Sequence, residues 1–426
     1  MNGTAETICV NRKLTPFWTL FILTGLNLVN YFDRAVLAAV LPSVQDDMHL
    51  NDSQGGWLGT AFMLGYFITS PVFGYFGDRT SRKWLIALGV FVWSVGTVLT
   101  GFAGTFALMV GFRVLVGVGE ASYATISPSY ISDTFSTHKR NNALTVFYSA
   151  IPVGAALGVL IGGLIEHQWG WRHAFILAGA PGLLLALLLL PFDEPERGAA
   201  DGAGHLAKPV LADVFKLFRL PQYMLVVGGY VAYTFALGAF GLWGPTFLHR
   251  VHGMAKVEAT NYFGIVLVVS GLLGTFIGGY AATAWHKRNP AAYAWVLGLS
   301  VLAAVPASVA AFLAETQTAS MTFLAAAMFL LFLGAGPVNT LILESVPPNL
   351  RASAMALSIF LIHLFGDVPS PLLVGWLSDV WHSLRQAMLI LPGALGVCAV
   401  LWLWLALRMR RTGLIHGNDS HAATGK

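Results

Sequence analysis

The chain has 426 residues, of which 56% are hydrophobic and only 10% are charged, and its mean hydropathy is +0.69. A soluble domain carries about 25% charged residues, so this composition excludes a water-soluble protein and indicates a chain that crosses a membrane many times. The net charge is +4, and the two cysteines and twelve histidines form no disulfide framework and no metal-ligand spacing. We therefore expect no metal, no cofactor and no nucleic-acid partner.

Twelve apolar segments are long enough to span a bilayer, which takes about 20 residues. They are 16–42, 55–77, 84–104, 107–132, 141–166, 172–192, 221–248, 260–284, 291–313, 319–345, 352–379 and 384–408. The longest connection separates the sixth from the seventh. We predict an all-α membrane protein with a tail (1–15), a six-helix bundle (16–192), a linker (193–220), a second six-helix bundle (221–408) and a second tail (409–426).

The basic residues predict the orientation, because Lys and Arg gather in cytoplasmic loops. With the N-terminus inside, the inner segments hold eighteen of them and the outer segments four, Arg172, Arg250, Lys256 and Arg385. Both termini are therefore expected in the cytoplasm. The short loops indicate a bacterial inner-membrane protein, and we expect a monomer. We expect the outer-loop acids Asp46, Asp47 and Asp52 to be solvated.

The linker ends in a segment, Val210–Leu220, in which Asp213, Lys216 and Arg219 recur every three residues with apolar residues between them. This pattern predicts a short amphipathic helix on the inner membrane surface. The alternative is a loop that continues into the next span.

The loop after the second span reads Gly77-Asp78-Arg79-Thr80-Ser81-Arg82-Lys83, and Asp133 and Arg140 flank the loop after the fourth span. Glu344 and Arg351 repeat this second spacing 211 residues later, which supports two related halves. Ion pairs that break when two halves rock can form a gate. The predicted cytoplasmic gate comprises Asp78, Arg79, Arg82, Lys83, Asp133 and Arg140. The alternative is that the loop after the second span only shows the enrichment in Lys and Arg that is usual for cytoplasmic loops.

Glycines recur in the fifth and eighth spans, among them Gly154, Gly158, Gly274 and Gly278. Small residues at four-residue spacing let helix backbones touch. We predict packing seams there and not ligand sites.

Four charges lie inside apolar spans: Asp33 and Arg34 in the first, Arg113 and Glu120 in the fourth. A charge near the bilayer centre costs about 2.5–3.5 kcal/mol on insertion scales, so such charges are usually functional. Asp33 and Arg113 are at similar depth, and we expect them to meet where the two helices touch.

The four charges sum to zero, so one interpretation is a structural ion-pair network. The other is proton coupling, with Asp33 first and Glu120 second as the protonated group. A buried carboxyl group holds its proton more firmly, and a nearby guanidinium weakens that hold. A movement of Arg113 relative to Asp33 would then couple proton binding to conformation.

The second half has milder polar candidates, and the expected cavity is charged on one wall and apolar and aromatic on the other. Such a cavity suits an amphiphile. His363 and Asp367 are four residues apart and face one way, as a ligand site or as a packing or capping pair. The candidate cavity residues are Asn30, Tyr123, Ser127, Tyr230, Tyr233, Asn339, His363 and Asp367.

Three stretches together resemble the spinster family of the major facilitator superfamily: Asn30–Arg34, the loop Gly77–Lys83, and Gly117–Pro128 with its Gly-Glu-Ala-Ser-Tyr sequence. The resemblance implies two six-helix bundles with a binding site between them at mid-membrane. Members are taken to export sphingosine-1-phosphate or lysophospholipids, and bacterial relatives are thought to be proton-coupled. By resemblance, Asp33 and Glu120 would be the protonation sites, and Arg34 and Arg113 their partners or headgroup contacts.

We therefore expect a proton-coupled secondary transporter of a lipid-like amphiphile, with membrane lipid around it. The resemblance to the family implies export of the substrate by antiport with protons. Import by symport would need the same chemical groups. The alternatives are a transporter of a small organic anion, a sugar acid or a drug, and a passive channel or scramblase. An intramembrane enzyme lacks support, because the sequence offers no nucleophile with a paired base.

Overall fold

The structure is a computed structural model that describes residues 15–77, 79–135, 137–189, 194, 215–346 and 350–422. At residues 75, 132, 137–142, 145, 186, 189, 351–353 and 411–422 it describes the backbone alone. All regular structure in these ranges is helical. Ten of the described helical segments are long and apolar enough to cross a membrane. The two remaining predicted spans, 55–77 and 172–192, also fold largely as helix, and the count of twelve spans stays a prediction.

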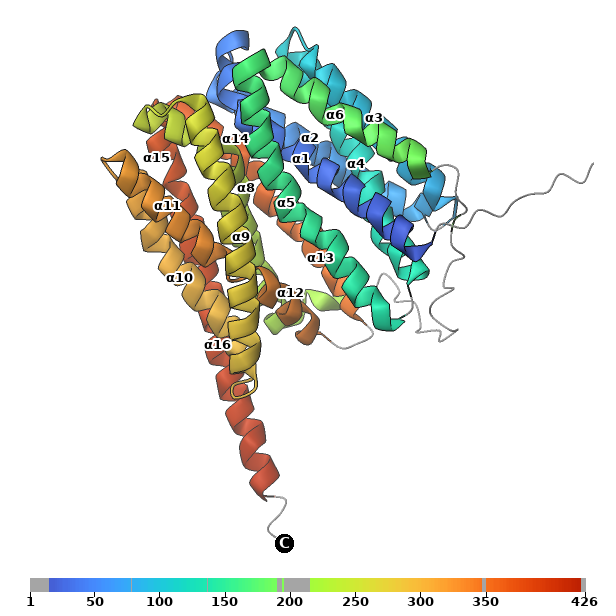
Figure 1. Cartoon of the computed structure of the whole chain (residues 1–426). Helices are drawn as coiled ribbons and strands as arrows, with labels where there is room; N and C mark the ends of the chain where they lie inside the picture. The colour runs from blue at the N-terminus through green and yellow to red at the C-terminus, as the bar shows by residue number, and fades with distance from the viewer. Residues whose placement is uncertain are drawn as a thin grey trace, which may run out of the picture.

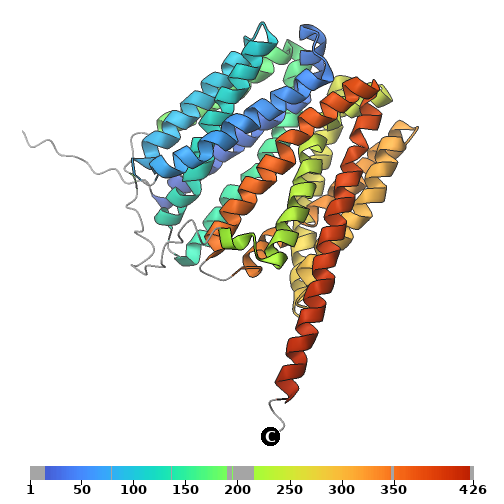
Figure 2. The same cartoon turned by 180° about the vertical axis from the view of Figure 1, so that it is seen from behind.

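The helices form two bundles that lie side by side (Figures 1 and 2). The first, the N-half, consists of α1 (Pro16–Met48), α2 (Asp52–Gly77), α3 (Arg82–Gly101), α4 (Phe106–Thr134), α5 (Thr137–Trp169) and α6 (Trp171–Leu189). The second, the C-half, consists of α8 (Pro221–His252), α9 (Lys256–His286), α10 (Ala292–Leu313), α11 (Gln317–Phe332), α12 (Ala335–Glu344), α13 (Arg351–Ile362), η2 (His363–Asp367), α14 (Pro369–Trp381), α15 (Leu384–Met388) and α16 (Ile390–Ala422). The pairs α2–α14 and α5–α9 join the halves.

Local sequence signals explain where several helices begin and end. Pro16 occupies the first turn of α1, where a missing N–H costs nothing. Asn51 and Gln54 form a reciprocal capping box at the start of α2, with bonds of 2.8 and 3.0 Å. Gly253 ends α8 with φ +68°, a conformation that glycine adopts without strain.

Two predicted spans are interrupted. The segment 319–345 is divided into α11 and α12 by a turn at Leu333–Gly334, because Pro337 has no N–H for the carbonyl of Leu333. The segment 352–379 contains the π-helical turn η2, in which Val368 N donates to His363 O at 3.1 Å. Pro369 follows that turn directly and cannot continue the α-helical ladder.

The glycine seams are confirmed as close helix contacts. A Cβ added to Gly154 or Gly158 of α5 would lie 2.4 or 2.2 Å from a backbone carbonyl oxygen of α1. A Cβ added to Gly278 of α9 would lie 2.0 Å from the carbonyl oxygen of Leu333. Any side chain at these positions would force the helices apart.

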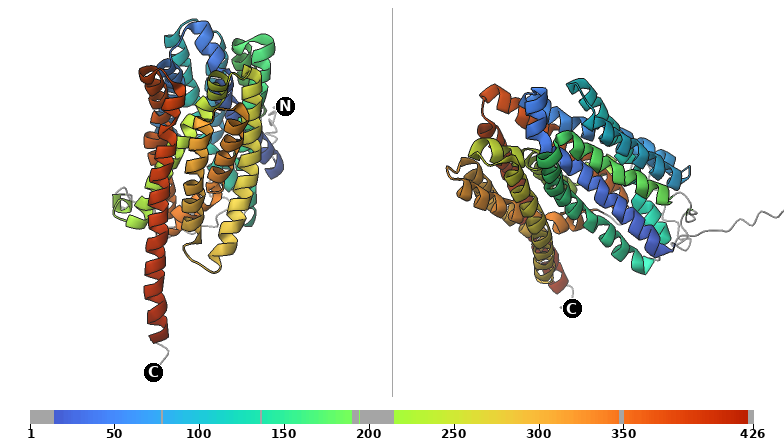
Figure 3. Two further views of the ribbon diagram at one scale, coloured as in Figure 1. Left: turned by 90° about the vertical axis from the view of Figure 1, so that its left-hand side faces the viewer. Right: turned by 45° about the horizontal axis from the view of Figure 1, so that its top comes forward.

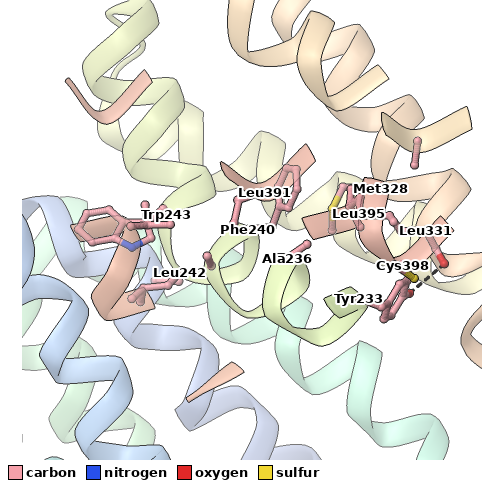
Figure 4. Close-up of a cluster of buried hydrophobic side chains, with 14 of the residues drawn as sticks. Tyr233, Ala236, Phe240, Leu242, Trp243, Met328, Leu331, Leu391, Leu395 and Cys398 are labelled. Atoms are coloured by element: carbon pink, nitrogen blue, oxygen red, sulfur yellow. Dashed lines mark hydrogen bonds between the residues drawn. The ribbon is translucent and has the colours of Figure 1, made fainter. Parts of the chain in front are cut away.

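The core of the C-half is apolar and aromatic. Figure 4 shows Phe240 of α8 beside Leu391 of α16, and Tyr233 near Cys398. Tyr233 donates its hydroxyl proton to the carbonyl oxygen of Leu331 at 2.9 Å, which satisfies the buried hydroxyl group.

Within the linker the structure describes Glu194 and then residues 215–220. Residues 215–217 form a helical turn in which Leu217 is buried, whereas Phe215 and Phe218 are exposed. Residues 210–214 lie outside the described part, so the amphipathic helix over 210–220 stays a prediction.

The halves are held together at the end where α1 passes into α2 and α8 into α9, which we call the closed end. Arg250 Nη1 donates to Asp52 Oδ1 at 2.6 Å, and Ser378 Oγ donates to Asp52 Oδ2 at 2.6 Å. Asp52 is only 8% exposed, so the expectation of a solvated Asp52 is wrong. Its carboxylate is buried because the C-half supplies donors for it.

Away from the closed end, the helices of the two halves separate. The α5–α9 contact begins with Gly163 against Thr260 and continues to Gly271 near Pro152. Beyond this point, the two helices diverge toward the opposite end of the molecule, which holds the α2–α3 connection (Figures 1 and 3).

Candidate substrate and proton site

A cavity of about 220 Å³ lies between the two halves. The N-half lines it with α1, α2, α4 and α5, and the C-half with α8, α9, η2 and α14. Its charged lining residues are Arg34 and Arg113 on the N-half side and Asp367 on the C-half side. The other lining residues are apolar or small, apart from Tyr31: Ala35, Leu37, Ala38, Gly59, Phe62, Met63, Ala155, Val159, Gly238, Gly241, Leu242, Phe263, Leu267 and Pro371.

Arg34 is the most fully partnered of these charges. Its Nε lies 2.5 Å from Glu120 Oε2, and the Glu120 side chain is completely buried. Its guanidinium carbon lies 4.8, 5.0 and 4.8 Å from the ring centroids of Tyr31, Phe62 and Tyr66. A carboxylate and three aromatic faces thus compensate for the desolvation of this cation.

Asp33 directly precedes Arg34 in the sequence. Its side chain is buried and contacts α3, whereas that of Arg34 contacts α4. The Oδ2 of Asp33 accepts a hydrogen bond from Thr97 of α3, and its Oδ1 has no hydrogen-bond partner within the described ranges. A carboxyl group held this way can keep a proton on its free oxygen, or ionise while Thr97 still donates to it.

Arg113 is 1% exposed and lines the cavity. Its guanidinium carbon lies 5.0 Å from the centroid of the Phe62 ring, which Arg34 also contacts. The Nε and Nη1 of Arg113 are buried and have no hydrogen-bond partner among the residues that the structure describes. Buried donors without partners cost free energy. Arg113 and Arg34 together bring two guanidinium groups to the lining of the cavity, and guanidinium groups bind the oxygens of a phosphate or carboxylate strongly.

The structure places three predicted N-half cavity residues inside the bundle. Asn30, Tyr123 and Ser127 are buried, and none is among the lining residues of the cavity. The Tyr123 hydroxyl donates to the carbonyl oxygen of Leu23 at 2.5 Å, because a buried phenol must find an acceptor.

The C-half candidates are distributed over several surroundings. Asp367 lines the cavity, and His363 Nδ1 lies 3.0 Å from both of its carboxylate oxygens. Tyr233 is buried in the C-half core beside the partly buried Tyr230, at 6.0 Å between ring centroids. Asn339 is exposed on α12.

Residues of the predicted cytoplasmic gate form a polar cluster at the end opposite the closed end. Arg82 pairs with Asp133 and, at 2.8 Å, with Glu194. Ser81 Oγ also donates to Glu194, at 2.7 Å. Although burial opposes it, the hydrogen bonds from Arg82 and Ser81 hold the pKa of Glu194 below its ordinary value. The backbone N–H of Lys83 lies 3.5 Å from Glu194 Oε2. Asp78 and the side chain of Arg140 lie outside the described residues.

The sequence did not point to several partners. Thr97 is one more hydroxyl in an apolar helix, and Phe62 and Tyr66 resemble ordinary lipid-facing aromatics. The closed-end partners Asp52 and Asp379 are separated by more than 300 residues, and only the fold brings them together. Groups of three or more metal-ligating side chains are absent from the part of the chain that the structure describes.

Comparison with known proteins gives one family. The model "Major Facilitator Superfamily" matches residues 23–368. The chain is 34% identical over 381 residues to protein spinster of Drosophila melanogaster, covering 86% of this chain and 62% of that protein, thus less than two thirds of its length. It is 36% identical to protein spinster homolog 1 of Xenopus tropicalis (84% and 72% covered). It is 33% identical to the sphingosine-1-phosphate transporter SPNS2 of Danio rerio (93% and 85% covered).

Among solved structures, the chain resembles a bacterial homolog of the human lysosomal transporter spinster, crystallised in an inward-facing and unoccupied conformation. The TM-score is 0.85 at 26% identity, with 93% of this chain and 98% of that chain covered. A D-xylose–proton symporter matches with a TM-score of 0.72 at 17% identity, covering 93% and 97%, which shows the fold alone.

Proposed function

Because the chain belongs to the major facilitator superfamily and is a spinster-like transporter, not an enzyme, we propose that it is a proton-coupled secondary transporter of a lipid-like substrate. The substrate class is a lysophospholipid or a sphingoid phosphate, carried by alternating access between the two halves. The proton is the coupling ion, and no other cofactor takes part.

The proposed topology places twelve spans in the membrane with both termini in the cytoplasm. The N-half (16–192) and the C-half (221–408) are the moving domains, and 193–220 is a cytoplasmic linker. In this topology the closed end faces outward, and the conformation is inward-facing. The similarity to an inward-facing spinster homolog supports this orientation. We propose a monomer in a bacterial inner membrane.

The observation that carries the substrate class is the pair of guanidinium groups, Arg34 and Arg113, in the lining of a largely apolar cavity. An anionic headgroup would bind to these two cations. An alkyl chain would lie against Phe263, Leu267 and Leu242 on the C-half side. The zebrafish relative that is named for sphingosine-1-phosphate transport supports a phosphate-bearing amphiphile.

Protons would bind to Asp33 and Glu120, because these carboxyl groups are fully buried and lie next to the headgroup cations. A rocking movement that changes the distance from either acid to Arg34 or Arg113 changes its proton affinity. Proton binding and conformation are thereby linked.

The test is uptake into proteoliposomes with an imposed pH gradient, comparing a lysophospholipid, a sphingoid phosphate and a sugar acid of similar charge. Gradient-driven movement of one of the two lipids, with no response to the sugar acid, is the expected result. Movement of the sugar acid alone would favour the organic-anion transporter. Lipid movement that the gradient does not drive would favour a scramblase.

A further inference from the structure

The aromatic ring of Tyr66 lies at the contact between the halves, with a guanidinium group on one side of it and an imidazole ring on the other. On its N-half side the guanidinium of Arg34 lies 4.8 Å from the ring centroid. On its C-half side the imidazole of His363 lies 6.0 Å away, centroid to centroid, in an edge-to-face arrangement. Tyr66 itself belongs to α2, and His363 to the π-helical turn η2.

This ring completes a continuous series of contacts from one half to the other. Glu120 pairs with Arg34, Arg34 faces Tyr66, Tyr66 meets His363, and His363 lies 3.0 Å from the Asp367 carboxylate. The series begins at a buried carboxyl group of the N-half and ends at a carboxyl group that lines the cavity.

The charges at the two ends of this series depend on each other. When Glu120 takes up a proton, Arg34 loses its negative partner and its field reaches the C-half more strongly. The charge of Arg34 repels a protonated His363 and attracts an ionised Asp367. An aromatic face that binds the cation holds Arg34 at this position, because its negative quadrupole points at the guanidinium.

Other titratable groups surround the series. Tyr31 and Asp33 flank Arg34 on α1, Arg113 shares the Phe62 ring with Arg34, and Tyr230 of α8 lies on the C-half side. None of these joins Arg34 to His363 by a contact of its own in the described residues, whereas Tyr66 touches both.

We propose that Tyr66 is a positioning residue that passes the protonation state of the Glu120–Arg34 pair to the His363–Asp367 pair. It thereby sets the pH at which the two halves change their relative position. The inference rests on the proposed proton coupling, but it concerns the conformational response and not the substrate. His363 and Asp367 lie in a π-helical turn, and such turns are frequently found at functional sites.

The chain offers a matched control beside Tyr66. Phe67 packs against Phe360 of α13 across the same contact, at 4.7 Å between ring centroids. It therefore joins the halves through an aromatic pair, as Tyr66 does, but it touches no charge in that pair. Replacing Tyr66 or Phe67 by leucine removes one aromatic contact between the halves. Only Tyr66→Leu interrupts the series of contacts from Glu120 to Asp367.

The experiment measures the distance between spin labels at Thr80 and Lys287, on the two halves at the end opposite the closed end, over pH 4–9. The protein is in lipid nanodiscs without substrate. Tyr66→Leu is expected to move the midpoint by about one pH unit, a tenfold change in proton concentration. Tyr66→Phe, which keeps the ring, and Phe67→Leu are expected to keep the wild-type midpoint.

A double variant separates coupling from general loosening. If the series is real, Tyr66→Leu adds no further shift to His363→Gln, because both interrupt the same path. Should Tyr66→Leu not fold, His363→Gln against Phe67→Leu carries the same comparison. Equal midpoints in Tyr66→Leu and Phe67→Leu, shifts that add, or no response of the wild type to pH would overturn the proposal. A failed lipid transport assay with an intact pH response would contradict only the substrate.

Discussion

Asp379 of α14 accepts hydrogen bonds from the backbone N–H groups of Asp52, at 3.0 Å, and Ser53, at 2.7 Å. A carboxylate of the C-half thus caps the first turn of a helix of the N-half, where the helix dipole favours negative charge. The closed end is held by this cap together with the Arg250–Asp52 ion pair. Opening that end must break both.

Asp379→Asn should therefore favour opening of the closed end. The amide keeps the shape but loses the charge, at a cost of about 1–2 kcal/mol, which is a five- to thirtyfold change in population. Distances between spin labels on the outer ends of α1 and α9 would measure it. Asp47→Asn is the control, because Asp47 pairs with Arg172 of its own half. Equal distance distributions in the two variants would contradict a role of the Asp379 cap in holding the closed end together.

Arg113→Lys should weaken recognition of the anionic headgroup. An ammonium group cannot replace a two-pronged guanidinium, and the loss of one charge-assisted hydrogen bond corresponds to about a ten- to hundredfold rise in KM. Transport kinetics of a phosphate-bearing lysolipid would measure the change. Arg172→Lys, at an exposed pair, should leave KM unaltered; a comparable rise there would show that the effect is unspecific.

Gly241 should govern the length of the accepted tail. It lines the cavity, and a Cβ added to it meets no atom within 4 Å. Gly241→Leu is therefore expected to fold normally while it fills the cavity, with a loss of about tenfold in kcat/KM for long chains and little for short ones. Gly111→Leu is the control, because Gly111 also has free space around it but does not line the cavity. A chain-length profile that Gly241→Leu leaves unchanged would place the tail elsewhere.

Glu194→Gln should destabilise the N-half by about 1–2 kcal/mol at pH 7, because the Arg82 pair loses its charge. The pKa of Glu194 is lowered in the folded protein, so its contribution is complete above the ordinary value of 4.5. It disappears as the pH falls through the lowered pKa. Thermal unfolding of both proteins should therefore converge at low pH. A difference that persists there would mean that the contact is not electrostatic.

The sequence predicted the charged residues of the site better than their pairing. Asp33, Arg34, Arg113 and Glu120 stand out because charges are rare in apolar helices. Asp33 and Arg113 do lie within electrostatic reach of each other, as expected. Their hydrogen bonds were not foreseen, because Thr97 donates to Asp33 and Arg34 donates to Glu120. Neighbouring residues on a helix point about 100° apart, and the rotation of α1 follows from packing that no local pattern reveals.

The helical segments could be predicted from the sequence, whereas their interruptions could not. An apolar run of about 20 residues has one favourable state in a bilayer, whereas a break depends on how the neighbours satisfy freed backbone groups. Pro337 and Pro369 were visible in the sequence, but the donors to carbonyl groups at the π-helical turn come from other helices. They are Thr234 of α8 for Ile362 and Thr60 of α2 for Val368. The contacts of Asp379 and Arg250 with Asp52 at the closed end likewise join residues that only the fold brings together.

We propose that the movement of protons and the movement of lipid are obligatorily linked through Asp33. The most direct measurement is the pH change inside proteoliposomes on addition of a lysophospholipid, without an imposed gradient. The wild type should show lipid-dependent proton movement, and Asp33→Asn should lose it while still exchanging lipid between the two sides. Proton movement that survives in Asp33→Asn, or lipid accumulation without any proton movement in the wild type, would contradict the account.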